Sequence, residues 1–86
     1  MILKIFTRNN CPKCPPAKKL GRDLENKSQV RIQIEWFDVD KIEGMAEGAF
    51  YQVMATPTMI LVDDKGKIAA EWRGKVPKES AILDKL

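Results

Sequence analysis

The sequence predicts an α/β fold, a four-stranded mixed sheet flanked by three helices in the order βαβαββα. Two observations support this prediction. Two apolar or alternating stretches, residues 1–6 and 30–37, lie on either side of a helical pattern, and such a strand–helix–strand unit forms a right-handed parallel crossover. Residues 59–72 then indicate two strands joined by a tight turn, which would add an antiparallel hairpin to the same sheet. We expect helices on both faces.

The 86 residues suffice for one domain, which we expect to span 1–86. The net charge is +3 and the lysines alternate with acids along the chain, so no basic face typical of nucleic-acid binding is predicted. No apolar run reaches the roughly 18 residues of a membrane span, and no signal-peptide pattern is found, so we expect a cytoplasmic protein. The chain has no histidine, which excludes Ser–His and Cys–His catalysis and the commonest metal ligand.

The first strand and the first helix follow from the spacing of apolar residues. Residues 1–6 form a short apolar run that ends in a polar group, which is typical of a buried strand. A helix from Pro12 to Asn26 is predicted by apolar residues at helical spacing. These residues are Ala17, Leu20 and Leu24.

Three prolines lie at the start of this helix. Pro12 suits the first helical position, with Cys11 as the N-cap. Pro15 and Pro16 each remove a backbone donor where intrahelical hydrogen bonding begins. We therefore expect a loosened or kinked first turn.

The middle of the chain predicts a half-buried strand and a second helix. Residues 30–37 alternate apolar and polar side chains, which indicates a strand with one buried face. The helix should span residues 41–52, with Asp40 as its N-cap and Glu43 as the capping-box partner. Two glycines weaken it by about 1 kcal/mol each relative to alanine, and leave a narrow face where another backbone could pack closely. The glycines are Gly44 and Gly48, and the residues expected to face inward are Ile42, Met45, Ala46, Ala49 and Phe50.

The last part of the chain predicts a hairpin and a terminal helix. Residues 59–62 are fully apolar, residues 63–66 form a turn ending in glycine, and residues 67–72 return as the partner strand. A helix over residues 78–86 should follow. Its inward-facing residues would be Ala81, Ile82 and Leu86.

The two cysteines, Cys11 and Cys14, form a C-x-x-C motif at the predicted strand–helix junction. Such a motif can hold zinc or an iron–sulfur cluster, attach haem, or perform dithiol chemistry. Structural zinc needs four ligands, and haem attachment needs a histidine where this chain has Pro15. A structural disulfide across so short a loop stabilises little. Redox chemistry is therefore the favoured interpretation, with two unreactive thiols, or a metal or cluster completed by outside ligands, as alternatives.

The position of Cys11 favours the thiolate, because the positive end of a helix dipole follows it and Arg8 and Lys13 add positive charge. We expect Cys11 to be exposed and Cys14 to be shielded in the first turn. We infer that Cys11 attacks a substrate disulfide to form a mixed disulfide, and that Cys14 then attacks Cys11 and releases the reduced substrate.

Together these features resemble the thioredoxin superfamily over nearly the whole chain. The match consists of Cys-Pro-x-Cys at a helix start, Thr56-Pro57-Thr58 before an apolar strand, a short hairpin, Gly74 and a terminal helix. The resemblance implies that Pro57 is cis and lies near both cysteines, and that the backbone of Thr56 pairs with an extended substrate segment. It also implies a substrate-binding surface that comprises Pro12, Lys13, Ala55, Thr56, Pro57 and Gly74.

The sequence combines features of two branches of this superfamily. Cys-Pro-x-Cys and the short chain look like glutaredoxin, whereas Ala55 to Ile60 with the following hairpin looks more like thioredoxin. Thioredoxins carry a buried acid six residues ahead of the first cysteine, where this chain has Ile5. Glutaredoxins have an acid after the hairpin that helps hold glutathione, and the corresponding segment 73–76 has none. Small thioredoxin-like proteins of archaea and anaerobes fit the size and the pattern best.

The resemblance implies a protein disulfide oxidoreductase that works as a monomer with a thioredoxin-reductase-type electron donor. No cofactor is expected besides the redox-active disulfide Cys11–Cys14, and no metal, nucleic acid or membrane is expected as a partner. The alternatives are a glutathione-dependent glutaredoxin, an electron donor dedicated to ribonucleotide reductase, and a non-redox or metal-binding or cluster-binding module.

Overall fold

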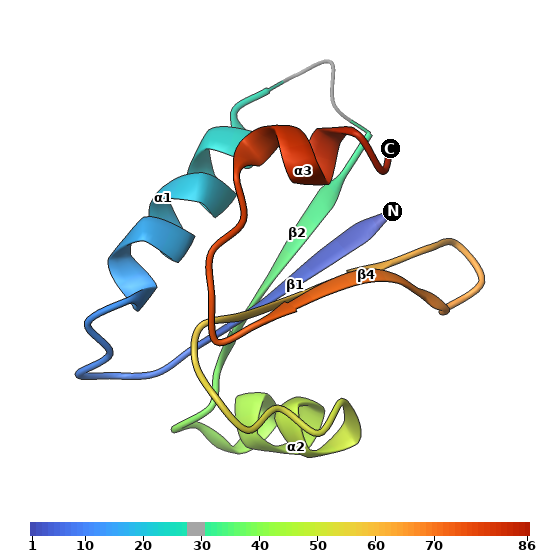
Figure 1. Cartoon of the computed structure of the whole chain (residues 1–86). Coiled ribbons are helices and arrows are strands. Elements are labelled where there is room, and N and C mark those ends of the chain that lie inside the picture. The colour runs from blue at the N-terminus through green and yellow to red at the C-terminus, as the bar shows by residue number, and fades with distance from the viewer. Residues whose placement is uncertain (28–30) are drawn as a thin grey trace.

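A four-stranded mixed sheet, in the order β2-β1-β3-β4, organises the chain (Figure 1). The computed structural model describes residues 1–27 and 31–86. The strands are β1 (Ile2–Thr7), β2 (Gln33–Asp38), β3 (Thr58–Val62) and β4 (Ile68–Arg73). The helices are α1 (Cys14–Glu25), α2 (Ile42–Phe50) and α3 (Glu79–Leu83). The predicted α/β fold and element order are confirmed.

The central strand β1 pairs in parallel with β2 and antiparallel with β3. Ile5, for example, lies opposite Trp36 on one side and Met59 on the other. The strand predicted over residues 30–37 starts outside the described residues, and β2 is observed from Gln33. The predicted hairpin joins β3 to β4, and Gly66 takes the left-handed φ of +82° that its turn requires.

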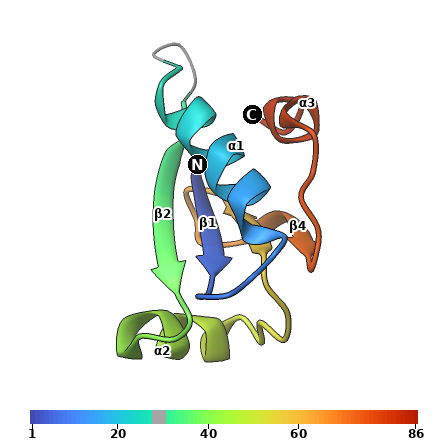
Figure 2. The same ribbon diagram turned by 90° about the vertical axis from the view of Figure 1, so that its left-hand side faces the viewer.

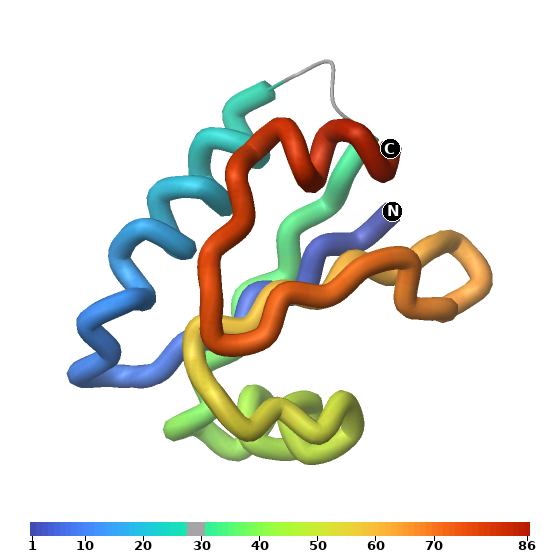
Figure 3. The backbone as a smooth tube through the Cα atoms, viewed as in Figure 1, coloured from blue at the N-terminus to red at the C-terminus, as the bar shows by residue number. Residues whose placement is uncertain are grey.

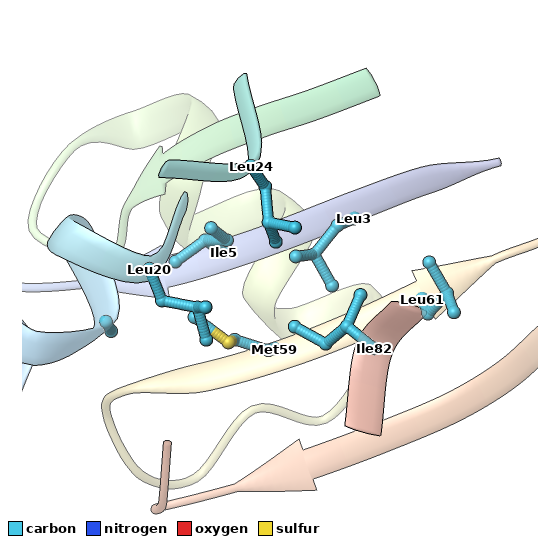
Figure 4. Close-up of a cluster of buried hydrophobic side chains, with 8 residues drawn as sticks. Leu3, Ile5, Leu20, Leu24, Met59, Leu61 and Ile82 are labelled. Atoms are coloured by element: carbon cyan, nitrogen blue, oxygen red, sulfur yellow. The ribbon is translucent and has the colours of Figure 1, made fainter. Parts of the chain in front are cut away.

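One face of the sheet packs against α1 and α3, and the other packs against α2 (Figures 1 and 2). Alternate residues of a strand point to opposite faces, so β1 directs Leu3 and Ile5 toward α1 and directs Lys4 and Phe6 toward α2. Figure 4 shows the larger core cluster, whose burial contributes about 1.5–3 kcal/mol for each large apolar side chain. The cluster comprises Leu3, Ile5, Ala17, Leu20, Leu24, Met59, Leu61 and Ile82.

Helix α1 starts at Cys14, later than predicted, with Lys13 as its N-cap. The expectations that Pro12 is the first helical residue and Cys11 the N-cap are therefore wrong. Pro15 and Pro16 occupy the second and third helical positions, where backbone N–H groups have no intrahelical acceptor in any case. The helix consequently accommodates both prolines without losing a hydrogen bond, and it runs as one α-helix from Cys14.

Helix α2 is oriented opposite to the prediction. Its apolar side chains point to solvent, and Ile42 and Phe50 are 84% and 77% exposed. The buried residues are Gly44 and Gly48. Glu47, which lies on the same side of α2 as the two glycines, forms an ion pair with Lys4 of the sheet. The residues that were expected to face inward and are instead exposed or only marginally covered are Ile42, Met45, Ala46, Ala49 and Phe50.

Gly44 allows α2 to approach β2 closely, as the sequence suggested for a narrow glycine face. A Cβ atom on Gly44 would overlap the backbone carbonyl of Asp38. The predicted capping box is wrong, because the N-cap is Lys41 and it makes no side-chain cap. The Asp40 carboxylate instead accepts a hydrogen bond from the Asn9 backbone N–H at 3.0 Å.

The space under α2 is filled by residues before and after the helix rather than by its own large side chains. Phe6 stacks on Phe37 with 5.1 Å between ring centroids, and Tyr51 packs edge-on against Phe6. Val39 and Val53 complete this second cluster. The core on this face is therefore built from the buried sheet residues Phe6, Ile60 and Val62 and from residues that flank α2.

Helix α3 is shorter than the predicted 78–86, and its buried residue is Ile82. Ile82 is fully buried, Ala81 is partly buried, and Leu86 lies beyond the helix end and is exposed. Across residues 1–27 and 31–86, none of the helices has the length and apolar character needed to cross a membrane.

Candidate functional site

Cys11 and Cys14 form a disulfide at the end of β1, with their Cα atoms 5.3 Å apart. Cys11 lies in the turn ahead of α1, and Cys14 is the first residue of the helix. Asn10, with a φ of +59°, turns the chain into this position, and asparagine tolerates that conformation better than most residues. Cys14 is 1% exposed and Cys11 is only partly buried, so the predicted contrast between the two cysteines is confirmed.

The segment before β3 lies against this disulfide. The Thr56-Pro57 peptide bond is cis, and Pro57 is buried. The Thr56 hydroxyl donates a hydrogen bond to Cys11 Sγ at 3.6 Å. The structure thus brings together the cysteine pair and the Thr-Pro segment that the resemblance placed near each other.

Gly74 joins the same site from the end of β4. Its N–H donates to the Pro57 carbonyl at 2.8 Å, and its φ is +70°. A Cβ atom on Gly74 would lie at an ordinary 3.4 Å from the Ala55 Cβ, so glycine is favoured here by the positive φ and not by a lack of space. The Thr58 hydroxyl also donates to the Ala55 carbonyl at 2.7 Å. Figure 3 shows these two segments meeting where β3 starts and β4 ends, from where one leads to α2 and the other to α3.

Pro12 and Lys13 occupy the turn between the two cysteines and are exposed. Beside the disulfide is an open hollow of about 600 Å³, whose lining includes Arg8 and Lys18 together with both cysteines. The residues that line this hollow include no carboxylate, and the first turn of α1 contains no acidic residue either. Positive charge next to a cysteine stabilises its thiolate, so the surroundings favour a reactive Cys11.

Ile5 occupies the position six residues ahead of Cys11 and is fully buried in the core under α1. The main charged cluster on the sheet lies on the opposite face, where Lys4 pairs with Glu47 and, at 3.1 Å, with Glu35. Burial lowers the pKa of Lys4, but the hydrogen bonds and charges of Glu47 and Glu35 outweigh it, and the pKa is raised above 10.5. This cluster stabilises the fold rather than supplying a carboxylate to the cysteines.

Arg73 is a residue of this region that the sequence did not single out. Its guanidinium donates to the carbonyl oxygens of Gln52 at 3.0 Å and Tyr51 at 2.9 Å. These contacts join segments more than 20 positions apart, so no local pattern reveals them. In residues 1–27 and 31–86 no group of three or more Cys, His, Asp or Glu side chains is arranged to hold a metal ion.

Comparison with known proteins gives consistent matches over the whole chain. A family model described as a thioredoxin domain matches residues 1–86. A thioredoxin of Methanocaldococcus jannaschii is 28% identical over 80 residues, which are 93% of this chain and 86% of that protein.

Two solved structures illustrate the similarity of the fold. A mutant thioredoxin from Halobacterium salinarum has a TM-score of 0.78 at 28% identity, covering 96% of this chain and 68% of the other. Thioredoxin-2, a component of the malaria parasite protein secretion machinery, has a TM-score of 0.81 at 23% identity, covering 99% and 82%. At that identity the second likeness shows the fold alone.

Proposed function

The chain belongs to the thioredoxin family and is a thiol–disulfide oxidoreductase, and from this premise we propose that Cys11 is the attacking cysteine and Cys14 the resolving one. Protein disulfides and reductases are the general partners of such a protein. The observation that carries the proposal is the unequal setting of the two sulfurs. Cys11 is accessible and accepts the Thr56 hydrogen bond, whereas Cys14 is buried.

The proposed reaction has two exchange steps. In the reduced protein, the Cys11 thiolate attacks one sulfur of the substrate disulfide, the substrate S–S bond breaks, and the departing thiolate takes up a proton. Cys14 then loses its proton and its sulfur attacks Cys11 Sγ, which breaks the mixed disulfide and releases the second substrate thiol. The two electrons gained by the substrate come from the dithiol, which becomes the Cys11–Cys14 disulfide. An electron donor returns them, and no cofactor besides this disulfide takes part.

The substrate would lie along the segment before β3. We assign pairing with an extended substrate chain to the backbone of Thr56, with Ala55, Pro57 and Gly74 shaping this edge. Pro12 and Lys13 would contact the substrate from the turn between the cysteines. The support is that all six predicted substrate-binding residues lie on the segments that surround the disulfide: Pro12, Lys13, Ala55, Thr56, Pro57 and Gly74.

We further propose that the protein is a cytoplasmic monomer that accepts electrons from a thioredoxin-reductase-type donor. The segment 73–76 has no acid of the kind that helps glutaredoxins hold glutathione, which supports this choice over a glutathione-linked donor. A coupled assay with glutathione, glutathione reductase and NADPH tests it, and we expect turnover with a thioredoxin reductase and little with glutathione. Faster turnover with glutathione would contradict the choice of donor.

The roles of the two cysteines are tested by a matched pair of variants in the reduction of insulin by dithiothreitol. Cys11→Ser should abolish the acceleration and form no mixed disulfide. Cys14→Ser should also lose turnover, but it should accumulate a covalent complex with a disulfide substrate, visible on a non-reducing gel. A Cys11→Ser protein that retained activity, or a complex formed only by that variant, would contradict the assignment.

A further inference from the structure

We propose that Arg73 is a positioning residue, which holds the segment 51–57 so that Thr56 stays against Cys11. This inference rests on the proposed dithiol function and adds a residue outside the cysteine pair and the Thr-Pro segment. The side chain of Arg73 reaches from the end of β4 to the end of α2, and the next residue, Gly74, reaches Pro57.

Each of the three guanidinium nitrogens of Arg73 donates a hydrogen bond. Nη1 donates to the Gln52 carbonyl, Nη2 donates to the Tyr51 carbonyl, and Nε donates to the Glu71 carboxylate at 2.5 Å. Hydrogen bonds from a charged donor are stronger than bonds between neutral groups. The carbonyl ends of a helix also carry partial negative charge, which favours a cation at this place.

The end of α2 needs such support, because its backbone adopts a turn that glycine usually supplies. The Gln52 N–H donates to the Ala49 carbonyl at 3.2 Å, and the Val53 N–H donates to the Gly48 carbonyl at 2.7 Å. This pair of bonds is a Schellman motif, in which the residue at the Gln52 position is left-handed. Gln52 has a φ of +55°, a left-handed conformation that is strained in a residue other than glycine.

Beyond this turn little packing holds the chain until Pro57. Met54 is 94% exposed and Ala55 is also exposed. The known anchors are the Thr58 hydroxyl on the Ala55 carbonyl and the Gly74 N–H on the Pro57 carbonyl, both near the end of the segment. Arg73 fixes the start of the segment, together with the packing of Tyr51 and Val53 on the second cluster. Loss of that anchor would let the segment shift, and with it the substrate-pairing backbone of Thr56.

The test is steady-state reduction of a disulfide protein by the full chain carrying Arg73→Met or Arg73→Lys. Because the shifted backbone would bind substrate less well, we expect Arg73→Met to raise KM about tenfold, the equivalent of losing roughly one charged hydrogen bond, while kcat changes by less than about twofold. Arg73→Lys keeps the charge but cannot donate to both carbonyls in the same way. Its KM should therefore lie between that of the wild type and that of Arg73→Met. Lys67→Met is the matched control, because Lys67 is an exposed cation just before β4, at the opposite end of the strand from Arg73, and its loss should keep the wild-type KM.

A second substitution separates positioning from general stability. Gln52→Gly relieves the left-handed strain, so Arg73→Met should raise KM less in that background than in the wild type. A KM for Arg73→Met and Arg73→Lys equal to that of the wild type, even with a lower melting temperature, would overturn the proposal, as would an equal rise in Lys67→Met. If the wild-type chain itself reduced no protein disulfide, the proposed function would fail instead, and the two failures are thereby distinguished.

Discussion

The Thr56 hydroxyl donates a hydrogen bond to Cys11 Sγ at 3.6 Å, although 45 positions separate the two residues in the chain. The contact joins the Thr-Pro segment to the sulfur that we propose as the nucleophile. A hydrogen bond to an anion is stronger than one to a neutral acceptor, so this donor stabilises the thiolate more than the thiol. We therefore expect the Thr56 side chain to act on Cys11, in addition to the substrate pairing that we propose for its backbone.

Thr56→Val removes this donor with almost no change in shape. We expect Cys11 of the reduced variant to react with iodoacetamide about threefold to tenfold more slowly at pH 7, because one hydrogen bond to a charged group is lost. The pH profile of alkylation should also shift to higher pH. Thr56→Ser keeps a hydroxyl and should restore the wild-type profile. Identical profiles for the valine variant and the wild type would show that the hydroxyl does not act on the thiolate.

Gly44 and Gly48 provide a matched pair that tests the packing of α2. Gly44→Ala should lower the free energy of unfolding by about 1–3 kcal/mol, because its Cβ would overlap the Asp38 carbonyl. Gly48→Ala should raise it by about 0.5–1 kcal/mol, since its Cβ would lie at an ordinary 3.6 Å from Val39 Cγ1 and alanine favours a helix. Urea denaturation measures both. Equal effects of the two substitutions would contradict the observed approach of α2 to β2.

We expect the protein to lose stability at high pH, because the ion pairs of Lys4 need a charged lysine. The pKa of Lys4 in the folded protein is raised above its ordinary value of 10.5. The ion pairs therefore contribute fully to the free energy of unfolding below pH 10.5, and this contribution is lost as the pH rises through the folded pKa. The free energy of unfolding should therefore fall more steeply above pH 10.5 in the wild type than in Lys4→Met. Urea titrations between pH 8 and 12 measure the difference. Parallel curves would show that the pKa of Lys4 is the same in the folded and unfolded chains.

Alanine substitution of Ile42 in α2, compared with that of Ile60 in β3, tests which side of α2 faces the core. Ile60→Ala, in the fully buried strand β3, should cost about 2–5 kcal/mol in the free energy of unfolding. Ile42→Ala should change it by less than about 0.5 kcal/mol, because Ile42 is 84% exposed. A large loss from Ile42→Ala would restore the orientation that the apolar spacing of α2 suggested.

The predicted and the observed orientation of α2 differ, which shows that periodicity alone does not determine which side of this helix faces the core. The apolar positions of α2 recur at helical spacing as in any amphipathic helix, and periodicity alone assigns them to the core. The observed orientation depends on Lys4, 43 positions away from Glu47, and on a glycine face that fits against Asp38. Neither partner lies within the window over which periodicity is read.

The first residue of α1 could likewise be predicted only approximately from the sequence. The three prolines indicated that the helix begins near the cysteines, but not at which residue. The structure begins it at Cys14, so that Pro15 and Pro16 fall where helical N–H groups have no acceptor. Cys11 is left in the preceding turn, where its sulfur reaches Thr56.

The sequence by itself determined the order of strands and helices, the hairpin, and a dithiol at the junction of the first strand and helix. These are local properties, because apolar periodicity, turn residues and the spacing of Cys11 and Cys14 each extend over a few residues. Only the tertiary structure decided that Thr56 reaches Cys11, that Arg73 caps the end of α2, and that α2 presents its apolar side to solvent. Such contacts join segments 20 to 45 positions apart, and they are set by strand register and by competing partners across the sheet.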